Sequence, residues 1–286
     1  MTDSLPIALS APLSPAQQTA LVNLVRRAAR TEILPRFRSI TRAEATAKTG
    51  PRDLVTEADR AAEAMIARGL QRLFPHALIV GEEAVADRPE LRDEVSEAEF
   101  AIIIDPVDGT WNFVHGLPLF GVIIAVTRFG RPVLGLLYDP VGDDWILADE
   151  TTSARLVAAS GVERAATTAA GGALGDLHGY VHVSLMGQAR QEAFYPRLAA
   201  LGQATALRCS CHEYRLLAQG AVDFVLSDRL NPWDHAAGVL ICQRAGGVAR
   251  MLDGHDYDTS LGEGLLLCAG SETTWTALRD HFADLA

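Results

Sequence analysis

Two segments in the first part of the chain carry apolar side chains at helical spacing, and both begin with a helix-start signal. The stretch 14–17, Ser-Pro-Ala-Gln, places Ser at the N-cap, Pro at the first helical position and Gln where it closes a capping box. The apolar face that follows continues to Pro35. Thr56 can cap a second helix, whose apolar face ends before Pro75. We therefore expect two amphipathic helices near the N-terminus.

Short runs of apolar and β-branched residues come next, and this pattern is typical of buried strands. They precede a link rich in Ala and Gly over residues 167–179. Two of the runs flank Gly130-Arg131, which predicts a β-hairpin. The expected strands of this meander-rich half are Ala77–Val80, Phe100–Ile104, Phe120–Phe129, Pro132–Tyr138 and Trp145–Ala148.

Beyond the link, strand-like and helix-like segments alternate, which predicts layers of sheet and helix around one core. We expect a mixed α/β (α+β) fold with an N-terminal α+β lobe over residues 1–166 and an alternating α/β lobe over residues 167–286, together one compact unit. The expected strands of the second lobe are Tyr180–Ser184, Ala206–Cys209, Val222–Leu226, Val248–Met251 and Leu265–Ala269. The expected helices are Ala189–Leu201, His212–Gln219, Asp234–Ala245 and Thr273–Ala283.

The composition describes a globular chain with an acidic balance. Of the 286 residues 49% are hydrophobic, and 25 basic against 36 acidic residues give a net charge of −11. This charge argues against a nucleic-acid or anionic-membrane partner. No stretch is long and apolar enough to span a bilayer. The first fourteen residues look like a loose leader and lack the basic start of a signal peptide.

The four cysteines favour a cytoplasmic protein with reduced thiols over a disulfide framework. The run Cys209-x-Cys211-His212 invites a zinc interpretation, but no second pair of ligands stands at suitable spacing. We therefore do not expect a zinc site.

Two carboxylates, Asp105 and Asp108, directly follow the apolar run 101–104. Asp-Pro and Asp-Gly pairs are common in turns, so a simple turn is one interpretation. A metal site is the other, because ligands collect beyond the carboxyl ends of strands and Glu82-Glu83 follows another short strand in the same way. Converging carboxylates repel one another unless a cation joins them, and hard divalent ions prefer such oxygen ligands. The spacing of these residues alone leaves both interpretations open.

Two further residues favour the metal interpretation, and a third does not do so on its own. Gly109 allows a ligand close to the backbone, and a helix that starts there presents free N–H groups to an anion. Thr110 supplies a hydroxyl that can orient a water molecule. Asp234 opens an apolar helix, and taken alone it is best explained as an ordinary acidic residue favoured by the helix dipole. Carboxylates beside free amides are what the hydrolysis of a phosphate ester needs.

Along the chain these residues belong to a series of short motifs. In their order, the motifs resemble those of the inositol monophosphatase family, within the lithium-sensitive, magnesium-dependent phosphatase superfamily. A match of several motifs in order is more specific than any one of them. The resemblance implies the layered α-β-α-β-α sandwich of the inositol monophosphatase and fructose-1,6-bisphosphatase type, and a homodimer. The matching motifs are Lys48, "DLVTEAD" (53–59), "GEE" (81–83), "DPVDGTWNF" (105–113), "WDHAAG" (233–238) and "AGG" (245–247).

The resemblance also implies ligands for two Mg²⁺ ions. Glu82, Asp105 and the carbonyl of Val107 would bind one ion. Asp105, Asp108 and Asp234 would bind the second. Most of these ligands belong to the N-terminal lobe.

The remaining roles implied by the resemblance concern water and phosphate. Asp59, with Glu82, would hold a third, weaker ion or its waters. Thr110 would orient the attacking water together with Glu82 and Asp59, and the amides of Gly109 and Thr110 would bind the phosphate. Lys48 is expected to contact the phosphate or the water, with a solvated loop lysine as the alternative.

The sequence departs from the family where the substrate is expected to bind. His212 and Glu213 stand where the family has small residues, and they would fill or recharge an inositol pocket unless their helix faces another way. The family places a carboxylate for a ring hydroxyl seven residues before the one that opens the later helix. That position is Ser227 here, with Asp228 beside it. Trp111 would form an aromatic wall near the phosphate or pack in the core.

We therefore expect a phosphomonoesterase that uses Mg²⁺, with two to three ions, to hydrolyse a small-molecule phosphate ester. An inositol 1-phosphate-like ester is the first candidate, and histidinol phosphate, fructose bisphosphate or a nucleotide phosphate are the alternatives. The competing class is a non-catalytic regulatory protein on the same fold. It is disfavoured because all five expected metal carboxylates are present.

Overall fold

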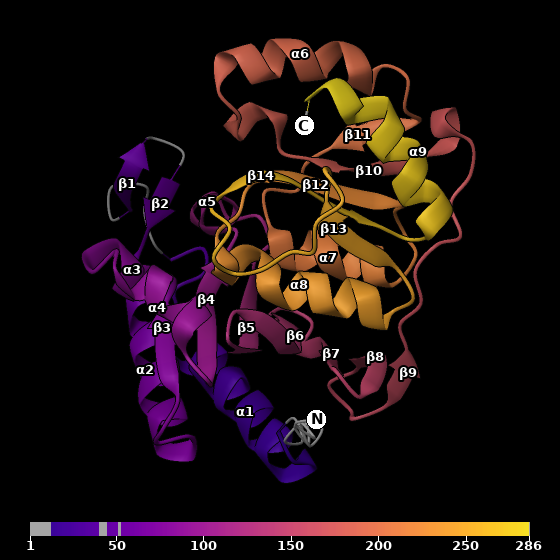
Figure 1. Cartoon of the computed structure of the whole chain (residues 1–286). Coiled ribbons are helices and arrows are strands. Elements are labelled where there is room, and N and C mark those ends of the chain that lie inside the picture. Colours follow the sequence, from indigo (N-terminus) through magenta and orange to yellow (C-terminus); the bar gives the residue numbers. More distant parts are fainter. Residues whose placement is uncertain (1–12, 40–44, 51–52, 286) are drawn as a thin grey trace, which may run out of the picture.

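Two β-sheets and the helices that cover them make up the protein (Figure 1). The computed structural model describes residues 13–39, 45–50 and 53–285, so most of the expected leader lies outside the described residues. A small antiparallel hairpin, β1 (Thr46–Gly50) with β2 (Asp53–Val55), stands apart from the two sheets.

The first sheet has seven strands that lie side by side in chain order. Its first two strands are parallel, and every later pair is antiparallel, as a meander requires. The strands are β3 (Leu78–Gly81), β4 (Ala101–Asp108), β5 (Gly121–Arg128), β6 (Arg131–Asp139), β7 (Asp144–Asp149), β8 (Thr152–Val157) and β9 (Glu163–Ala165).

The second sheet has five strands in the order β11-β10-β12-β14-β13. β10 is parallel to both of its neighbours, and β14 is antiparallel to both of its own. The strands are β10 (His178–Val181), β11 (Gln203–Thr205), β12 (Phe224–Arg229), β13 (Val248–Met251) and β14 (Glu263–Ala269).

The helices fill three layers around and between the sheets (Figure 1). α1 and α2 cover the outer face of the first sheet, α7 and α8 lie between the sheets, and α6 and α9 cover the far face of the second. The helices are α1 (Pro15–Ala28), α2 (Glu57–Leu73), α3 (Glu82–Asp87), α4 (Leu91–Glu97), α5 (Thr110–Val114), α6 (Gln188–Leu198), α7 (Ser210–Ala218), α8 (Pro232–Arg244) and α9 (Glu272–Phe282).

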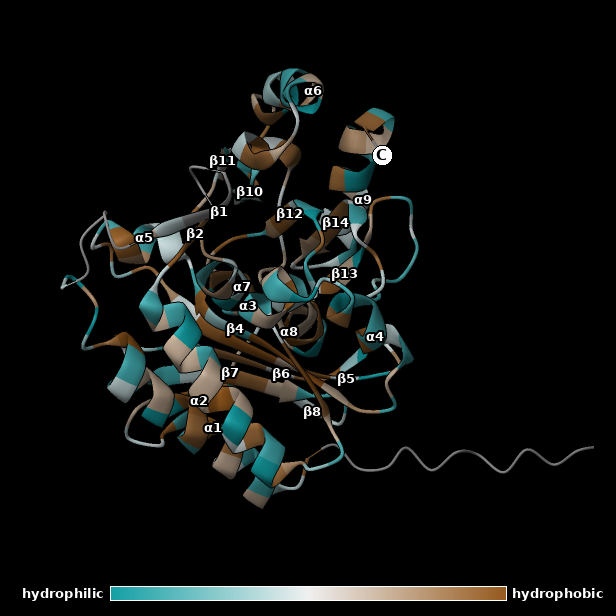
Figure 2. Cartoon of the chain, turned by 90° about the vertical axis from the view of Figure 1, so that its left-hand side faces the viewer, coloured by the Kyte–Doolittle hydropathy of each residue, from teal (hydrophilic) through white to brown (hydrophobic). Residues whose placement is uncertain are grey.

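Strand β4 shows why both faces of the first sheet must be covered. All its residues are buried, and successive side chains point to opposite faces. Ile102 and Ile104 join the core that contains α1 and α2, whereas Ala101 and Ile103 join the core that contains α7 and α8. The strands accordingly form a hydrophobic band between layers of amphipathic helices (Figure 2). The expected layered α-β-α-β-α sandwich is confirmed.

Both N-terminal helix starts follow the sequence signals. Ser14 and Gln17 form the expected capping box, with Pro15 as the first helical residue. Thr56 caps α2, and here Asp59 closes the capping box from the third helical position. Asp59 therefore has a structural task in addition to the metal role expected for it.

Several boundaries differ from the expectations. The strand expected at Ala206–Cys209 is wrong: β11 ends at Thr205, and Arg208 adopts a left-handed backbone conformation with φ of 58° that a strand does not contain. Residues 82–87 form the helix α3 directly after β3, and α7 begins at Ser210, two residues earlier than expected. β8 and β9 extend the meander beyond the strands expected from the sequence.

The division of the chain into lobes at 166/167 stays a prediction. The boundary lies in the segment between β9 and β10 that joins the two sheets. α8 comes from the second half of the chain but packs on strands β5, β6 and β7 of the first sheet. None of the helices in the described part of the chain combines the length and the apolar character that a membrane span requires.

Candidate active site

The end of β4 carries two of the expected metal ligands. β4 pairs regularly with β5 as far as Asp105, and the register then shifts before Asp108 pairs with Gly121. The Oδ1 atom of Asp105 accepts a hydrogen bond of 3.1 Å from the Val107 amide, which holds the irregular segment in place. Asp105 and Asp108 are both buried.

Gly109 makes the tight turn from β4 into α5 possible. Its φ is 87°, and a Cβ atom there would lie 2.8 Å from the carbonyl oxygen of Leu119, so a side chain is excluded by both strain and space. Thr110 begins α5 immediately afterwards. Its Oγ1 atom lies 3.0 Å from the carbonyl oxygen of Val107 and 3.1 Å from Oδ1 of Asp59.

Asp59 connects the start of α2 with Thr110. Its Oδ2 atom accepts hydrogen bonds from the amide and the hydroxyl of Thr56, at 2.8 and 2.6 Å, while Oδ1 faces Thr110. Burial raises the pKa of Asp59 to about 7, with the charges of Glu82 and Glu83 adding to the rise and the Thr56 hydrogen bonds opposing it. The side chain is thus fixed at both oxygens beside a cluster of like charges.

Asp105, Asp108 and Asp234 form a compact acidic group. Carboxylate oxygens of the three residues all lie within 4.8 Å of one another. Burial, followed by the charge of Asp234, raises the pKa of Asp108, as expected for like charges that share a site. Such an all-carboxylate set suits a hard divalent cation, which would offset the repulsion. The group can therefore hold a metal ion.

Hydrogen bonds from neighbouring segments hold Asp108 and Asp234 in position. The Oδ2 atom of Asp108 accepts hydrogen bonds from the amide of Cys211, at 2.5 Å, and the thiol of Cys209, at 3.0 Å. Asp234 lies in the first turn of α8, where the Asn231 side chain donates to its Oδ2 atom at 3.0 Å. Segments that are far apart in the chain therefore meet at one point.

Glu82 reaches the site from a different direction, as the first residue of α3. The carboxylate of Glu63, on α2, accepts hydrogen bonds from the amides of Glu83 and Ala84, at 2.8 and 2.9 Å. It occupies the space beside Gly81, where a Cβ atom would lie 2.1 Å from it. The buried Glu63 therefore anchors the start of α3 and with it the position of Glu82.

Several of these groups border one small hollow of about 160 Å³, although Asp59, Asp105 and Val107 do not line it. Six of its lining residues were expected in the site: Glu82, Asp108, Gly109, Thr110, Trp111 and Asp234. Sequence reasoning missed the others, which are Leu54, His182, Leu185, Arg208, Cys209 and Ser210. Cys209 and Ser210 stand just before the helix expected from His212, but the sequence carried no local signal for His182.

The structure places the expected substrate residues in different surroundings. Trp111 lines the hollow, where its ring stacks on His115 with centroids 4.0 Å apart and lies 4.1 Å from the guanidinium carbon of Arg208. Asp228 lines a neighbouring hollow of about 840 Å³ together with Arg190, and Leu185 borders both hollows.

The other expected substrate residues that the structure describes do not line the hollow. Ser227 is buried in β12. His212 places its Nε2 atom 3.2 Å from the carbonyl oxygen of Phe120, and burial lowers its pKa. Glu213 has no exposed surface and contacts His182. Of the residues the structure describes, neither His212 nor Glu213 lines the hollow. Lys48 belongs to β1, but its side chain lies outside the described part of the chain.

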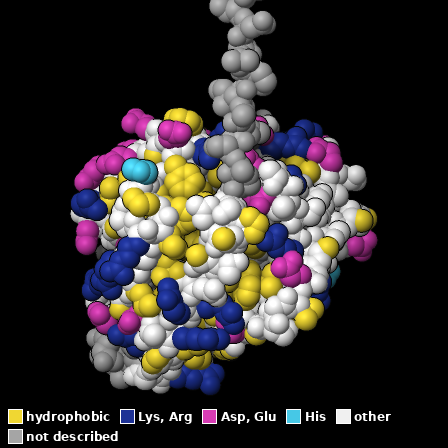
Figure 3. Space-filling model, turned by 90° about the horizontal axis from the view of Figure 1, so that it is seen from below, with side chains coloured by type: hydrophobic (Ala, Val, Ile, Leu, Met, Phe, Trp, Pro, Cys, Tyr) yellow, Lys and Arg dark blue, Asp and Glu magenta, His cyan; other side chains and the backbone are white. Residues whose placement is uncertain are grey.

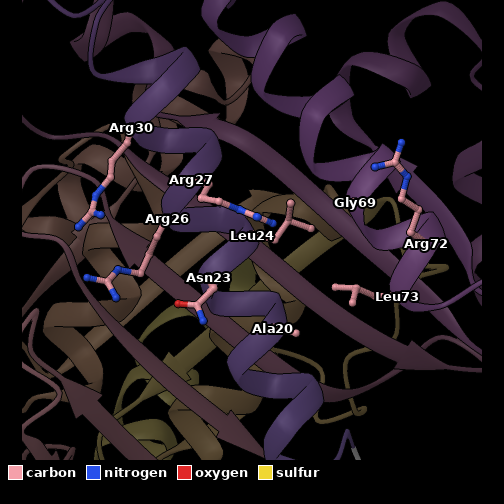
Figure 4. Close-up of a pocket in the computed structure, with 9 residues that line it drawn as sticks. All are labelled: Ala20, Asn23, Leu24, Arg26, Arg27, Arg30, Gly69, Arg72 and Leu73. Carbon is pink, nitrogen blue, oxygen red and sulfur yellow. The ribbon is translucent and has the colours of Figure 1, made fainter.

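A separate hollow of about 440 Å³ between α1 and α2 is lined by Arg26, Arg27, Arg30 and Arg72. The underside of the molecule carries several such basic side chains among hydrophobic ones (Figure 3). Arg26 and Arg30 point to one side of α1, where both pair with Asp143, whereas Arg27 points to the other side over Leu24 (Figure 4). The arginines do not converge, and none of the described residues that line this hollow is a carboxylate, so it is not the catalytic candidate.

Comparison with known proteins agrees with this fold. Residues 16–283 match the inositol monophosphatase family. The fructose-1,6-bisphosphatase/inositol-1-monophosphatase of Thermotoga maritima is 32% identical over 209 residues, which cover 73% of this chain and 75% of that protein. Nus factor SuhB of Escherichia coli (strain K12) is 31% identical over 251 residues, which cover 83% and 87%.

Solved structures show the same architecture. The inositol monophosphatase of Zymomonas mobilis has a TM-score of 0.77 at 24% identity and covers 95% of this chain and 100% of its own. The extragenic suppressor protein SuhB of Bartonella henselae has a TM-score of 0.77 at 25% identity, over 93% and 98% of the two chains. The fold is therefore that of the inositol monophosphatases.

The fold and the acidic hollow define a phosphatase, a hydrolase of phosphate esters. The chain belongs to the inositol monophosphatase family and is a phosphomonoesterase.

Proposed function

We propose that this phosphomonoesterase hydrolyses a small-molecule phosphate ester with Mg²⁺ as its cofactor. The observation that carries the proposal is the group formed by the buried Asp105 and Asp108 with the partly buried Asp234, of which Asp108 and Asp234 line one hollow together with Gly109 and Thr110. A cation at the carboxylates and a phosphate at the turn would be neighbours there.

The donor set suits Mg²⁺ because every side-chain donor is a carboxylate oxygen. Asp105, Asp108 and Asp234 would hold one ion, and Glu82 with Asp105 and the Val107 carbonyl a second. Asp59 with Glu82 would hold a third, weaker one. When bound, the ions supply a nucleophilic water at neutral pH and stabilise the oxygen that leaves.

Thr110 and Asp59 are placed to orient the attacking water. The Thr110 hydroxyl can give its hydrogen to Oδ1 of Asp59 or to the Val107 carbonyl, both about 3 Å away. Its oxygen then keeps lone pairs that accept a hydrogen bond from water. The amides of Gly109 and Thr110 would bind phosphate oxygens at the start of α5, with Lys48 as a further contact.

The first substrate candidate is an inositol 1-phosphate-like ester, because relatives such as the inositol-1-monophosphatase of Mesorhizobium japonicum carry that activity in their names. Histidinol phosphate or another sugar or nucleotide phosphate is the alternative, because the residues around His212 and Ser227 depart from the family. We further propose a homodimer in the cytoplasm, and light scattering of the purified protein measures that assembly.

A panel of phosphate esters with and without Mg²⁺ tests the proposal. Phosphate release from at least one ester should require Mg²⁺ and stop with chelator. Asp105→Asn should lower kcat by at least about a thousandfold, because it removes a ligand that both main ions share. An Asp105→Asn variant with near-normal turnover would refute the metal assignment, and no release from any ester would refute the function. Circular dichroism of the variant controls for folding.

A further inference from the structure

His182 and Glu213 form an ion pair behind the hollow. Glu213 lies in the first turn of α7 with no exposed surface, and its carboxylate accepts a hydrogen bond of 2.7 Å from the Leu207 amide. The Nε2 atom of His182 lies 2.8 Å from both oxygens of this carboxylate. A buried carboxylate is costly without a cationic partner, so it stabilises the imidazolium form of His182.

The protonation of His182 follows from these contacts. Burial lowers the pKa of the imidazole, but the charge and the hydrogen bond of Glu213, with smaller contributions from Asp234 and Asp108, raise it to about 9. With Nε2 used by Glu213, Nδ1 remains as a second donor, and it makes no hydrogen bond to any residue that the structure describes. His182 also lines the hollow that holds Asp108 and Thr110. The cationic ring therefore borders the space where a substrate would lie.

A second cation borders the same hollow. Arg208 lines it with its guanidinium group 4.1 Å from the Trp111 ring centroid. Its left-handed backbone, with φ of 58°, is held by Asn112, whose side chain donates to the carbonyls of Leu207 and Arg208. A non-glycine residue in this conformation costs on the order of 1 kcal/mol, so the surrounding contacts determine the position of Arg208.

The lining of the hollow therefore carries both signs of charge. Glu82, Asp108 and Asp234 are acidic and suit cations, while His182 and Arg208 contribute positive charge. A hydroxyl of a neutral polyol could accept the hydrogen bond from the imidazolium but would bring no charge, whereas an anionic group would supply both the acceptor and the opposite charge. We propose that the substrate carries a second anionic group, a carboxylate or another phosphate, besides the phosphate that is cleaved, and that His182 binds it.

This inference rests on the proposed phosphatase function, and within it favours the alternative esters over inositol 1-phosphate, which carries no second anionic group. Matched substrates separate the function from the inference. 2-Phosphoglycerate differs from glycerol 2-phosphate by a carboxylate in place of a hydroxymethyl group. Fructose 1,6-bisphosphate differs from fructose 1-phosphate by a second phosphate. The wild-type protein with Mg²⁺ should favour the more anionic member of at least one pair by about tenfold or more in kcat/KM, as a charge-assisted hydrogen bond predicts. The pair that shows the preference identifies the second group as a carboxylate or a phosphate.

Variants test the role of His182. His182→Gln should reduce that preference at least about fivefold, because glutamine keeps a donor but carries no charge. Glu213→Gln should reduce it similarly, and the double variant should lose little more, because both changes act through one imidazolium. His255→Gln is the matched control, since His255 is exposed and pairs with Asp253 at the surface. It should leave the preference unchanged.

Two results would overturn the inference. One is Mg²⁺-dependent phosphate release with no preference for the anionic member of either pair. The other is a His182→Gln variant that loses the same factor in kcat/KM on both members of each pair, since His182 would then serve the cleaved phosphate. In either case the proposed function would stand. Absence of phosphate release from all four esters and from para-nitrophenyl phosphate would overturn the function and the inference together.

Discussion

Lys48 is the only lysine among the 25 basic residues of this chain. Arginine supplies every other fixed positive side-chain charge, and arginine does not react with amine-directed reagents under mild conditions. Chemical modification can therefore address a single side-chain amine, that of Lys48. The family resemblance implies that this amine contacts the phosphate. Few proposed phosphate contacts can be tested so selectively.

Acetylation of amines should lower turnover at least about tenfold, because it removes a charge-assisted hydrogen bond to phosphate. Mass spectrometry of the modified protein and phosphate release with Mg²⁺ measure the effect. Inorganic phosphate with Mg²⁺ should protect Lys48 from the reagent. Reductive methylation keeps the charge and serves as the matched control, with a smaller loss expected. Full activity after complete acetylation of Lys48 would contradict the assigned contact.

At the scale of elements, α2 positions two separate parts of the site. Asp59 in its first turn closes the capping box and contacts Thr110, while Glu63 one turn later binds the amides at the start of α3. The two acidic residues stand four positions apart and so lie on the same face of the helix. α2 therefore sets the distance between Thr110 and Glu82.

Glu63→Ala should weaken the apparent affinity for Mg²⁺ by about ten- to a hundredfold, because the start of α3 loses its anchor and Glu82 moves. At saturating Mg²⁺ most of kcat should return. Activity measured against Mg²⁺ concentration separates these effects. Glu57→Ala, which removes an exposed carboxylate from the same helix, is the matched control. An unchanged Mg²⁺ dependence in Glu63→Ala would rule out the anchoring role.

The contact between α1 and the first sheet depends on charge. Asp143, between β6 and β7, accepts hydrogen bonds from Arg26, Arg30 and the hydroxyl of Tyr138. The hydrogen bond from Arg26 is the largest cause that holds the pKa of Asp143 well below its ordinary value, although burial opposes it. Because the folded pKa is depressed, this stabilisation is present above the ordinary aspartate pKa of about 3.9 and is lost as the pH falls below it.

Asp143→Asn should therefore reduce the free energy of unfolding by roughly 1 kcal/mol at pH 7, and the difference from wild type should shrink as the pH falls below about 4. Asparagine tolerates the left-handed backbone of this position, where φ is 50°. Urea unfolding across this pH range is the measurement. Asp280→Asn, which removes a surface pair with Arg279, should show a smaller effect. A difference that does not vary with pH would exclude the charged contact as its cause.

At the scale of the whole molecule, α8 joins the two sheets and also carries Asp234. It packs closely on the first sheet at Gly135 of β6, where a Cβ atom would lie 2.6 Å from the carbonyl oxygen of Ala237. On its other side, Gly238 of α8 leaves room for the ring of Tyr214, which a Cβ atom would approach to 2.2 Å. Because Gly135 and Gly238 have no side chains, α8 packs close to both β6 and α7. This packing determines where Asp234 lies relative to Asp108.

Gly135→Ala should lower the free energy of unfolding by about 1–3 kcal/mol, because the added methyl group pushes α8 away from β6. It should also weaken Mg²⁺ binding, because Asp234 moves with the helix. Urea unfolding and a Mg²⁺ titration measure the two effects. Gly187→Ala, where a Cβ atom meets nothing within 4 Å, is the matched control. Unchanged stability and Mg²⁺ affinity in Gly135→Ala would contradict the packing argument.

The sequence by itself determined the layered fold, both N-terminal helix caps and the family. Helical periodicity, capping boxes and the run from Asp105 to Thr110 are readable because each depends on residues within a few positions of one another. The strand predicted at Ala206–Cys209 was wrong, because Asn112 from α5 holds Arg208 in a left-handed backbone conformation there.

Only the tertiary structure decided which residues surround the segment from Asp105 to Thr110. Glu63 and Glu83 are 20 residues apart, His182 and Glu213 are 31 apart, and Asp59 and Thr110 are 51 apart. No local pattern encodes such pairs, because packing of the sheets and helices brings them together. The sequence therefore identified the candidate ligands of the acidic group, whereas the fold placed the imidazole of His182 at the same hollow.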